Sequence, residues 1–265
     1  MDVFQPGLFD DRNIFIAGGT SGINLAIAKR FARLGARVAV AGRNPDRAAA
    51  AAEEIGNGAL GLSCDVRNYD ATHHALQHAA EAFGLLDIVI SGAAGNFLAP
   101  ALEMSANAFR TVVDIDLNGT FNVFRACHAF LRRPGASLIA VSARQAVNSI
   151  PLQAHACAAK AGINQLVRVL AMEWGAGGVR VNGICPGPIE GTEGMARLAA
   201  GAGAVAARTA HIPLRRFGRL EEVADCAVFL CSPAAGYVTG TILDCDGGSQ
   251  LGDTGEYAAA AGEQI

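Results

Sequence analysis

Several features that would assign this chain to a class of protein are missing from its sequence. The net charge is only −3, so no broad basic surface is predicted for nucleic acid or for an anionic membrane. The N-terminal residues MDVFQPGLFDDR lack the cationic segment and the apolar run of a signal peptide. No apolar stretch is long enough to span a bilayer. Nucleic-acid and membrane partners are therefore not expected.

The cysteines lack the spacing of a metal site or of a redox motif. There are seven, an odd number, with no CxxC and no Cys/His cluster. We interpret them as thiols of a reducing compartment and expect no bound metal. The final residues, Glu263 to Ile265, do not resemble the Ser-Lys-Leu peroxisomal address, so the expected location is the cytoplasm.

What is present is an alternation of short apolar runs with longer stretches of helical period. The chain has 265 residues, 51% hydrophobic and 17% charged, which is enough for one domain spanning residues 1–265 with a large core. The alternation predicts an α/β fold: one doubly wound (Rossmann) parallel sheet of seven strands with helices on both faces. The expected strands are Asn13–Ala17, Arg37–Ala41, Ala59–Cys64, Asp87–Ser91, Ser137–Ser142, Val179–Cys185 and Ile242–Cys245.

One span, from about Ile189 to Arg216, is irregular and rich in Gly, Ala and Arg. Long connections of this kind often cover a binding site, so we expect a substrate cover here.

A glycine-rich turn follows the first predicted strand and opens a helix. Its sequence is AGGTSGIN, Ala17 to Asn24, and its backbone NH groups are suited to a pyrophosphate. The second strand ends VAVAGRN, with no acidic residue to bind the two ribose hydroxyls of NAD. Arg43 follows that strand, and a guanidinium can bind a 2′-phosphate, which favours NADP(H). The alternative is that Arg43 is an ordinary solvated side chain.

These motifs resemble the short-chain dehydrogenase/reductase family. The G-xxx-G-x spacing, SGAAGNF, CPGPIEGT, PLRRFGRLEEVA and DGG match it in order, from about Asn13 to Gly248. Asn24 departs from the pattern, because the family usually has a third glycine there. By resemblance, the cofactor contacts are Gly18, Thr20, Ser21, Gly22, Ile23, Arg43, Asp65, Val66, Ala93, Ala94, Gly95, Lys160, Pro186, Gly187, Ile189 and Thr192. Asp65 could equally cap a helix.

The family's catalytic tetrad is largely replaced. The positions of its asparagine, serine, tyrosine and lysine hold Asp116, Ala143, Ala156 and Lys160. A methyl side chain cannot pass a proton to an alcohol or ketone oxygen, so Ala156 argues against ordinary ketone chemistry.

Four segments, GAAGNFLAP, FRTVVDIDLNGTFNV, HACAAKAG and PGPIEGTEG, resemble the 2,4-dienoyl-CoA reductases of this family, and most of all the peroxisomal type, which also lacks the tyrosine. The resemblance implies NADPH-dependent reduction of a 2,4-dienoyl-CoA to a 3-enoyl-CoA in unsaturated fatty acid degradation. It also implies that Asp116 donates the proton, with Lys160 acting through a water. To donate near neutral pH, Asp116 has to stay protonated, which burial in an apolar pocket favours.

The group that polarises the thioester is left open between Asn118, Gln145 and His155. His155 and Lys160 are about 140° apart around an ideal helix and do not share a face. By the same resemblance Asn96, Phe97 and Gln145 contact the substrate. Four arginines of the irregular span are candidates for the coenzyme A phosphates: Arg197, Arg208, Arg215 and Arg216.

Two other functions remain open at this point. One is reduction of a 3-oxoacyl thioester or another ketone, with water or His155 in place of tyrosine. The other is a cofactor-binding protein without turnover. The expected assembly is a homotetramer.

Overall fold

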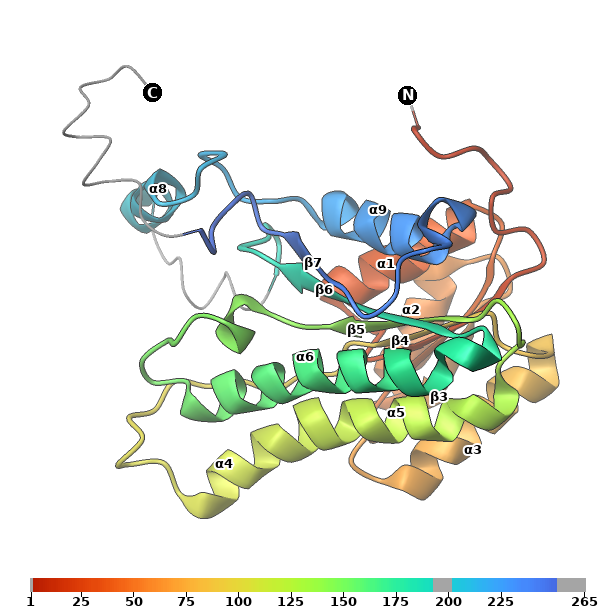
Figure 1. Cartoon of the computed structure of the whole chain (residues 1–265), viewed down its shortest axis with the longest axis horizontal. Helices are drawn as coiled ribbons and strands as arrows, with labels where there is room; N and C mark the ends of the chain where they lie inside the picture. The colour runs from red at the N-terminus through yellow and green to blue at the C-terminus, as the bar shows by residue number, and fades with distance from the viewer. Residues whose placement is uncertain (1, 193–201, 252–265) are drawn as a thin grey trace.

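The computed structural model describes residues 2–192 and 202–251, and one seven-stranded parallel sheet runs through them (Figure 1). All seven predicted strands are present, each within one residue of the expected bounds. They are β1 Asn13–Ala17, β2 Arg37–Gly42, β3 Leu60–Ser63, β4 Ile88–Ser91, β5 Ser137–Val141, β6 Arg180–Pro186 and β7 Ile242–Cys245. Their order in the sheet is β3-β2-β1-β4-β5-β6-β7. The predicted doubly wound α/β fold is confirmed.

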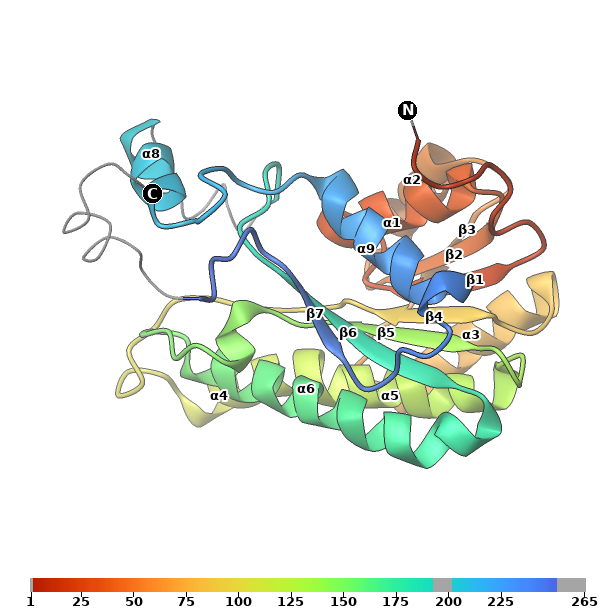
Figure 2. The ribbon, with the colours of Figure 1, turned by 45° about the horizontal axis from the view of Figure 1, so that its top comes forward.

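Helices cover both faces of the sheet (Figure 2). One face carries α1 Gly22–Arg33, α2 Pro45–Ile55 and α9 Leu220–Cys231, and the other carries α3 Tyr69–Phe83, α4 Ala106–Val113, α5 Gly119–Cys127 and α6 Ala154–Trp174. Short helical turns are η1 Asp114–Asn118, η2 His128–Phe130, η3 Arg144–Ala146, η4 Gly175–Gly177 and η5 Pro233–Ala235.

The central strands are apolar on both sides because both faces are buried. In β1, Ile14 and Ile16 pack into the core beneath α1 and α9, whereas Phe15 and Ala17 pack into the core beneath α3, α5 and α6. Successive side chains of a strand point to opposite faces, so one apolar run supplies both cores. The apolar runs in the sequence are nearly continuous because both sides of each central strand are buried.

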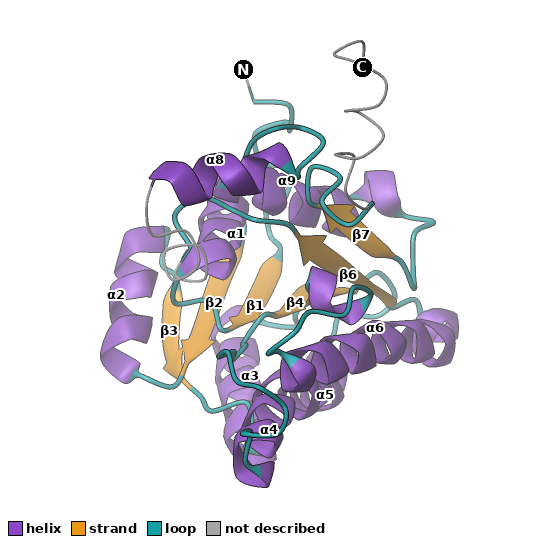
Figure 3. Cartoon of the chain, turned by 90° about the vertical axis from the view of Figure 1, so that its left-hand side faces the viewer, coloured by secondary structure: helices purple, strands orange, loops and turns teal. Residues whose placement is uncertain are grey.

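The irregular span contains a helix that the sequence did not indicate, α8 Ala202–Ala210 (Figure 3). Figure 3 places α8 above the carboxyl ends of the strands, which is the side expected of a cover. Arg197 lies outside the described residues, so its predicted role is not addressed by the structure.

The strand order brings β1 and β4 together at the centre of the sheet, where chain connections leave in opposite directions. Ligands of open α/β sheets bind in the crevice at the carboxyl ends of the strands beside such a point. The glycine-rich turn after β1 and the SGAAGNF segment after β4 both lie at this edge.

No helix within residues 2–192 and 202–251 is long and apolar enough to cross a membrane. In the same residues, no group of three or more His, Cys, Asp or Glu side chains is arranged for a metal ion.

Candidate active site

The turn before α1 has open space where a phosphate would lie. Gly22 has φ +56°, and a Cβ added there would meet no atom within 4 Å. Ser21 caps α1 in an extended conformation without a side-chain capping bond, and the first turn of the helix has no acidic residue. The free NH groups and the positive end of the helix dipole therefore face a space that suits an anion. The predicted contacts Thr20 and Ile23 belong to the same turn. These residues fit the pyrophosphate of a dinucleotide.

Asn24, the departure from the glycine pattern, connects two loops of the cofactor edge. Its Nδ2 donates to the carbonyl of Gly92 at 2.8 Å and to that of Gly18 at 3.3 Å. The space for this amide exists because residue 92 is glycine, since a Cβ there would lie 2.3 Å from Oδ1 of Asn24. Gly18 is also required, because its Cβ would lie 2.6 Å from the backbone nitrogen of Ala93. Where the family usually has a third glycine, Asn24 therefore joins the two loops by hydrogen bonds.

Arg43 follows β2 at the protein surface, and its positive charge helps to lower the pKa of the Asp65 carboxyl. Asp65 accepts hydrogen bonds from Arg67, which hold the pKa of its carboxyl below the ordinary value. Asp65 is not a helix cap, because Asn68 caps α3 by accepting from the NH of Ala71 at 3.0 Å. The exposed guanidinium of Arg43 suits a ribose phosphate at this edge.

The predicted nicotinamide contacts are backbone segments held at fixed positions. A Cβ on Gly187 would lie 2.6 Å from Cα of Asp246, so the segment after β6 packs directly on the DGG turn. Ile189 is buried, and the hydroxyl of Thr192 donates to its carbonyl at 2.9 Å. Pro186 ends β6. Val66 is buried behind the site.

Asp116 and Lys160 form a buried ion pair at the centre of the site. Oδ2 of Asp116 lies 3.2 Å from Nζ of Lys160, and the two side chains are 1% and 9% exposed. Oδ1 of Asp116 accepts from the NH of Gly95 at 2.8 Å, and Nζ of Lys160 donates to the carbonyl of Val141 at 3.1 Å. The pair joins the segment after β4, helix α6 and the end of β5. The two residues that the sequence singled out for proton transfer therefore meet.

The position of Asp116 depends on a π-helical turn. Residues Ala106–Cys127 form one continuous helical stretch, and η1 within it adds a residue to the turn that carries Asp116. Such turns within α-helices occur frequently at functional sites. Thr120 donates to the carbonyl of Asp116 at 2.7 Å and contacts Ser91 of β4 at 3.1 Å. The turn is thereby tied to the sheet.

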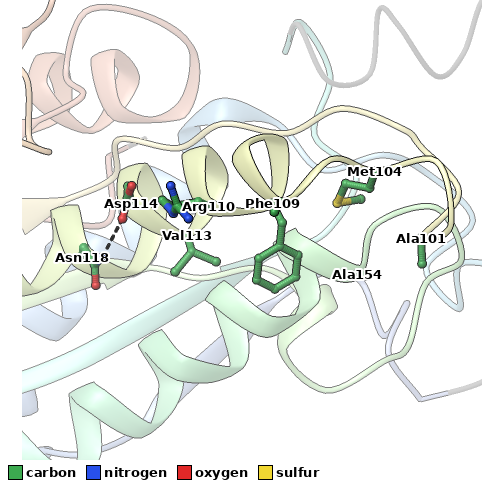
Figure 4. A pocket seen from close by; sticks show the side chains of 9 residues that line it. Ala101, Met104, Phe109, Arg110, Val113, Asp114, Asn118 and Ala154 are labelled. Atoms are coloured by element: carbon green, nitrogen blue, oxygen red, sulfur yellow. Dashed lines mark hydrogen bonds between the residues drawn. The ribbon is translucent and has the colours of Figure 1, made fainter.

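Asn118 lies apart from Asp116. It is exposed, and its Nδ2 donates to Asp114 at 2.8 Å on the outer side of the helix (Figure 4). Residues two apart on a helix do not face the same way. Asn118 and Asp114 line a hollow of about 820 Å³ with Ala101, Met104, Ala106, Phe109, Arg110, Val113 and Ala154. The structure does not bring Asn118 together with the buried pair.

Gln153 links the predicted substrate residues, and the sequence analysis did not select it. Its Oε1 accepts from Asn96 at 2.7 Å and from Gln145 at 3.0 Å. Gln153 is buried and lies directly before α6. A polar residue two positions before the HACAAK segment was the available signal.

His155 is completely buried, and its ring packs edge-on against Phe97 with 4.3 Å between the ring centroids. Neither ring nitrogen has a hydrogen-bond partner. His155 and Lys160 make different contacts, as their rotation around the helix predicts. Phe97 is 39% exposed, so one side of its ring is available to a ligand.

Two of the arginines proposed for coenzyme A, Arg215 and Arg216, already contact protein groups. Arg215 donates to the carbonyl of Ala210. Arg216 pairs with Glu222 at 2.6 Å and holds the pKa of that carboxyl at about 2, below its ordinary value of 4.5. Arg208 is half-buried in α8. Arg215 and Arg216 are therefore engaged by protein groups.

Fold, glycine turn and buried Lys160 together define a nicotinamide-dependent oxidoreductase of the short-chain class. A family model described as Enoyl-(Acyl carrier protein) reductase matches residues 17–250. The chain belongs to the short-chain dehydrogenase/reductase family.

Within that family, the chain is 42% identical over 254 residues to "Peroxisomal 2,4-dienoyl-CoA reductase [(3E)-enoyl-CoA-producing]" of Pongo abelii, covering 94% of this chain and 87% of the relative. It is 38% identical to "Probable 2,4-dienoyl-CoA reductase [(2E)-enoyl-CoA-producing]" of Bacillus subtilis, covering 91% and 98%. A crystal structure of a short chain dehydrogenase from Bacillus anthracis superposes with a TM-score of 0.82 at 37% identity, covering 91% and 97%.

Proposed function

We propose that this protein reduces a 2,4-dienoyl-CoA to a 3-enoyl-CoA with NADPH. The observation that carries the proposal is the buried Asp116–Lys160 pair, in a site where Ala143 and Ala156 occupy the places of the usual serine and tyrosine. Such a site has an acid–base pair but no hydroxyl for a ketone oxygen. The relatives named as 2,4-dienoyl-CoA reductases support the substrate.

The reaction needs a proton delivered to carbon rather than to oxygen. When bound, the cofactor would supply a hydride to C5 of the substrate, with the electron pair moving along the diene to the thioester oxygen. A proton then adds to C2, the pair returns to restore the C=O bond, and a C3=C4 double bond remains. Asp116 delivers that proton through a water that Lys160 holds, after taking it from the Lys160 ammonium across their 3.2 Å contact. The hydrogen bond from Gly95 fixes the carboxyl at the segment after β4, beside the predicted substrate residues.

NADP(H) is the proposed cofactor because Arg43 is exposed at the end of β2, where no acidic side chain competes for the ribose hydroxyls. Arg43→Ala should lower the ratio of kcat/KM for NADPH over NADH by about 10- to 100-fold, since a bidentate phosphate contact is lost. An unchanged ratio would exclude this role for Arg43.

Purified protein mixed with NADPH and a 2,4-dienoyl-CoA should consume both in equal amounts. Analysis of the product by NMR distinguishes the 3-enoyl thioester from the 2-enoyl thioester. Failure to form either product would overturn the proposal. Turnover of a 3-oxoacyl thioester instead would favour the ketone reductase, and NADPH binding without any turnover would favour a cofactor-binding protein.

We also propose a homotetramer in the cytoplasm. Exposed apolar side chains on the outer helices, Phe109, Phe121 and Met172, support association of copies. Sedimentation velocity tests the assembly. Imaging of a tagged chain tests the location, and a peroxisomal signal, as the names of several relatives suggest, would correct it.

A further inference from the structure

The unpaired buried side-chain nitrogens of the described residues belong to two residues, Arg144 and His155. Within residues 2–192 and 202–251, six buried side-chain polar atoms have no hydrogen-bond partner, and the only nitrogens among them are Nε of Arg144 and the two ring nitrogens of His155. The others are oxygens of Asn13, Asn24 and Ser137. A buried donor without an acceptor costs free energy, so a cluster of them marks a place where a ligand can supply the acceptor.

Both residues lie at the catalytic edge of the sheet. Arg144 begins η3, directly after Ala143 at the carboxyl end of β5, and His155 lies in the first turn of α6. The turn η3 packs against α6. The carbonyl of Val141, three residues before Arg144, accepts the hydrogen bond from Lys160. Arg144 therefore follows the strand end that contacts Lys160, and His155 lies on the same helix as Lys160.

The other candidate donors to the thioester are already engaged. The amide of Gln145 donates to Gln153, and Asn118 donates to Asp114 on the outer side of its helix. Within the part of the chain that the structure describes, Nε of the Arg144 guanidinium has no hydrogen-bond partner. A guanidinium binds oxyanions with several N–H donors in fixed geometry.

We propose that Arg144 binds the thioester oxygen of the acyl-CoA substrate and stabilises the negative charge that develops there, with His155 as the neighbouring donor. This inference rests on the proposed function, because the charge arises only when hydride adds to the conjugated thioester. Phosphates of coenzyme A are the less suitable ligand, since Nε of Arg144 is buried and they are bulky, strongly hydrated groups. Preorganised donors aimed at a developing oxyanion act most strongly where water is excluded.

The test compares Arg144→Met and Arg144→Lys with Arg33→Met, a matched change on an exposed arginine at the end of α1. Folding of each variant is checked by circular dichroism. The kcat for 2,4-dienoyl-CoA should fall on the order of 100-fold in Arg144→Met, as for loss of one oxyanion donor. Arg144→Lys should retain part of the rate because it keeps the charge, and Arg33→Met should match the parent protein.

A second measurement does not depend on turnover. With oxidised cofactor, which has no hydride to give, a dienoyl-CoA bound to the parent protein should show a red-shifted absorption, because polarisation of its carbonyl extends the conjugation. Arg144→Met should lose the red shift, whereas its affinity for a thioether analogue without the carbonyl should stay unchanged.

The outcomes separate the two proposals. If the parent protein reduces no dienoyl-CoA, the proposed function fails. If it does, and Arg144→Met keeps both the rate and the red shift, the role of Arg144 fails alone. Weaker binding of free coenzyme A with an unchanged red shift would assign Arg144 to a phosphate and overturn the inference. If Arg144→Met does not fold, Arg144→Gln is measured in its place: loss of the rate and of the red shift supports the role of Arg144, and an unchanged rate and red shift overturns it.

Discussion

Replacement of Asp116 tests the buried ion pair both as a structural element and as a source of protons. The side chain is 1% exposed and has two donors, Nζ of Lys160 at 3.2 Å and the NH of Gly95 at 2.8 Å. Asp116→Asn keeps the shape and an oxygen for Gly95 but removes the charge. Lys160 is then left buried with only the carbonyl of Val141 as a recorded partner.

Removal of one member of a buried pair typically costs about 3–5 kcal/mol, because the other charge stays buried without compensation. Since Asn preserves one of the two contacts, we expect the free energy of unfolding of Asp116→Asn to fall by about 3 kcal/mol. Lys160→Met should cost a similar amount. The double variant should cost less than the sum, with a coupling of about 2 kcal/mol, because no charge is left unpaired.

The assay is urea unfolding followed by circular dichroism near neutral pH, at one protein concentration because association would alter the apparent stability. In parallel, kcat for dienoyl-CoA should fall by about 10²- to 10⁴-fold in Asp116→Asn, as for loss of a general acid. Single-variant effects that add to within about 0.5 kcal/mol would refute the coupling. Unchanged kcat in Asp116→Asn would refute the proton-donor role.

Three further predictions concern other parts of the chain. The pKa of Glu222 is about 2, below its ordinary 4.5, so its stabilising contribution is present above pH 4.5 and is lost as the pH falls toward 2; Glu222→Gln should therefore be less stable by about 1 kcal/mol near neutral pH, with the difference disappearing in acid unfolding curves. Gly92→Ala should weaken NADPH binding and stability because its Cβ would strike Asn24, and the double variant with Asn24→Gly should recover both; calorimetry that finds no recovery would contradict this account. Burial raises the pKa of the Cys127 thiol, whereas a hydrogen bond from a neighbouring thiol lowers that of Cys226, so mass spectrometry after brief alkylation should find Cys226 modified and Cys127 intact.

The sequence by itself determined the strands, the sheet type and the phosphate turn. These features follow from local pattern: apolar runs of strand length form buried parallel strands, and a glycine-rich turn between a strand and a helix has a single backbone solution. The sequence also has Ala156 where the family has tyrosine, which implies that Asp116 and Lys160 carry the proton transfer. Predicted and observed strand boundaries differ by no more than one residue.

Only the tertiary structure decided which polar side chains face one another. Asp116 and Asn118, two residues apart, face different ways on their helix, and only packing against α6 shows that Asp116 is the one buried beside Lys160. Gln153 and Arg144 carry no motif, and their importance appears only when the hydrogen bonds around them are traced. The physical reason is that a side chain's partners come from segments distant in the chain, which packing brings together, and a local pattern contains no record of them.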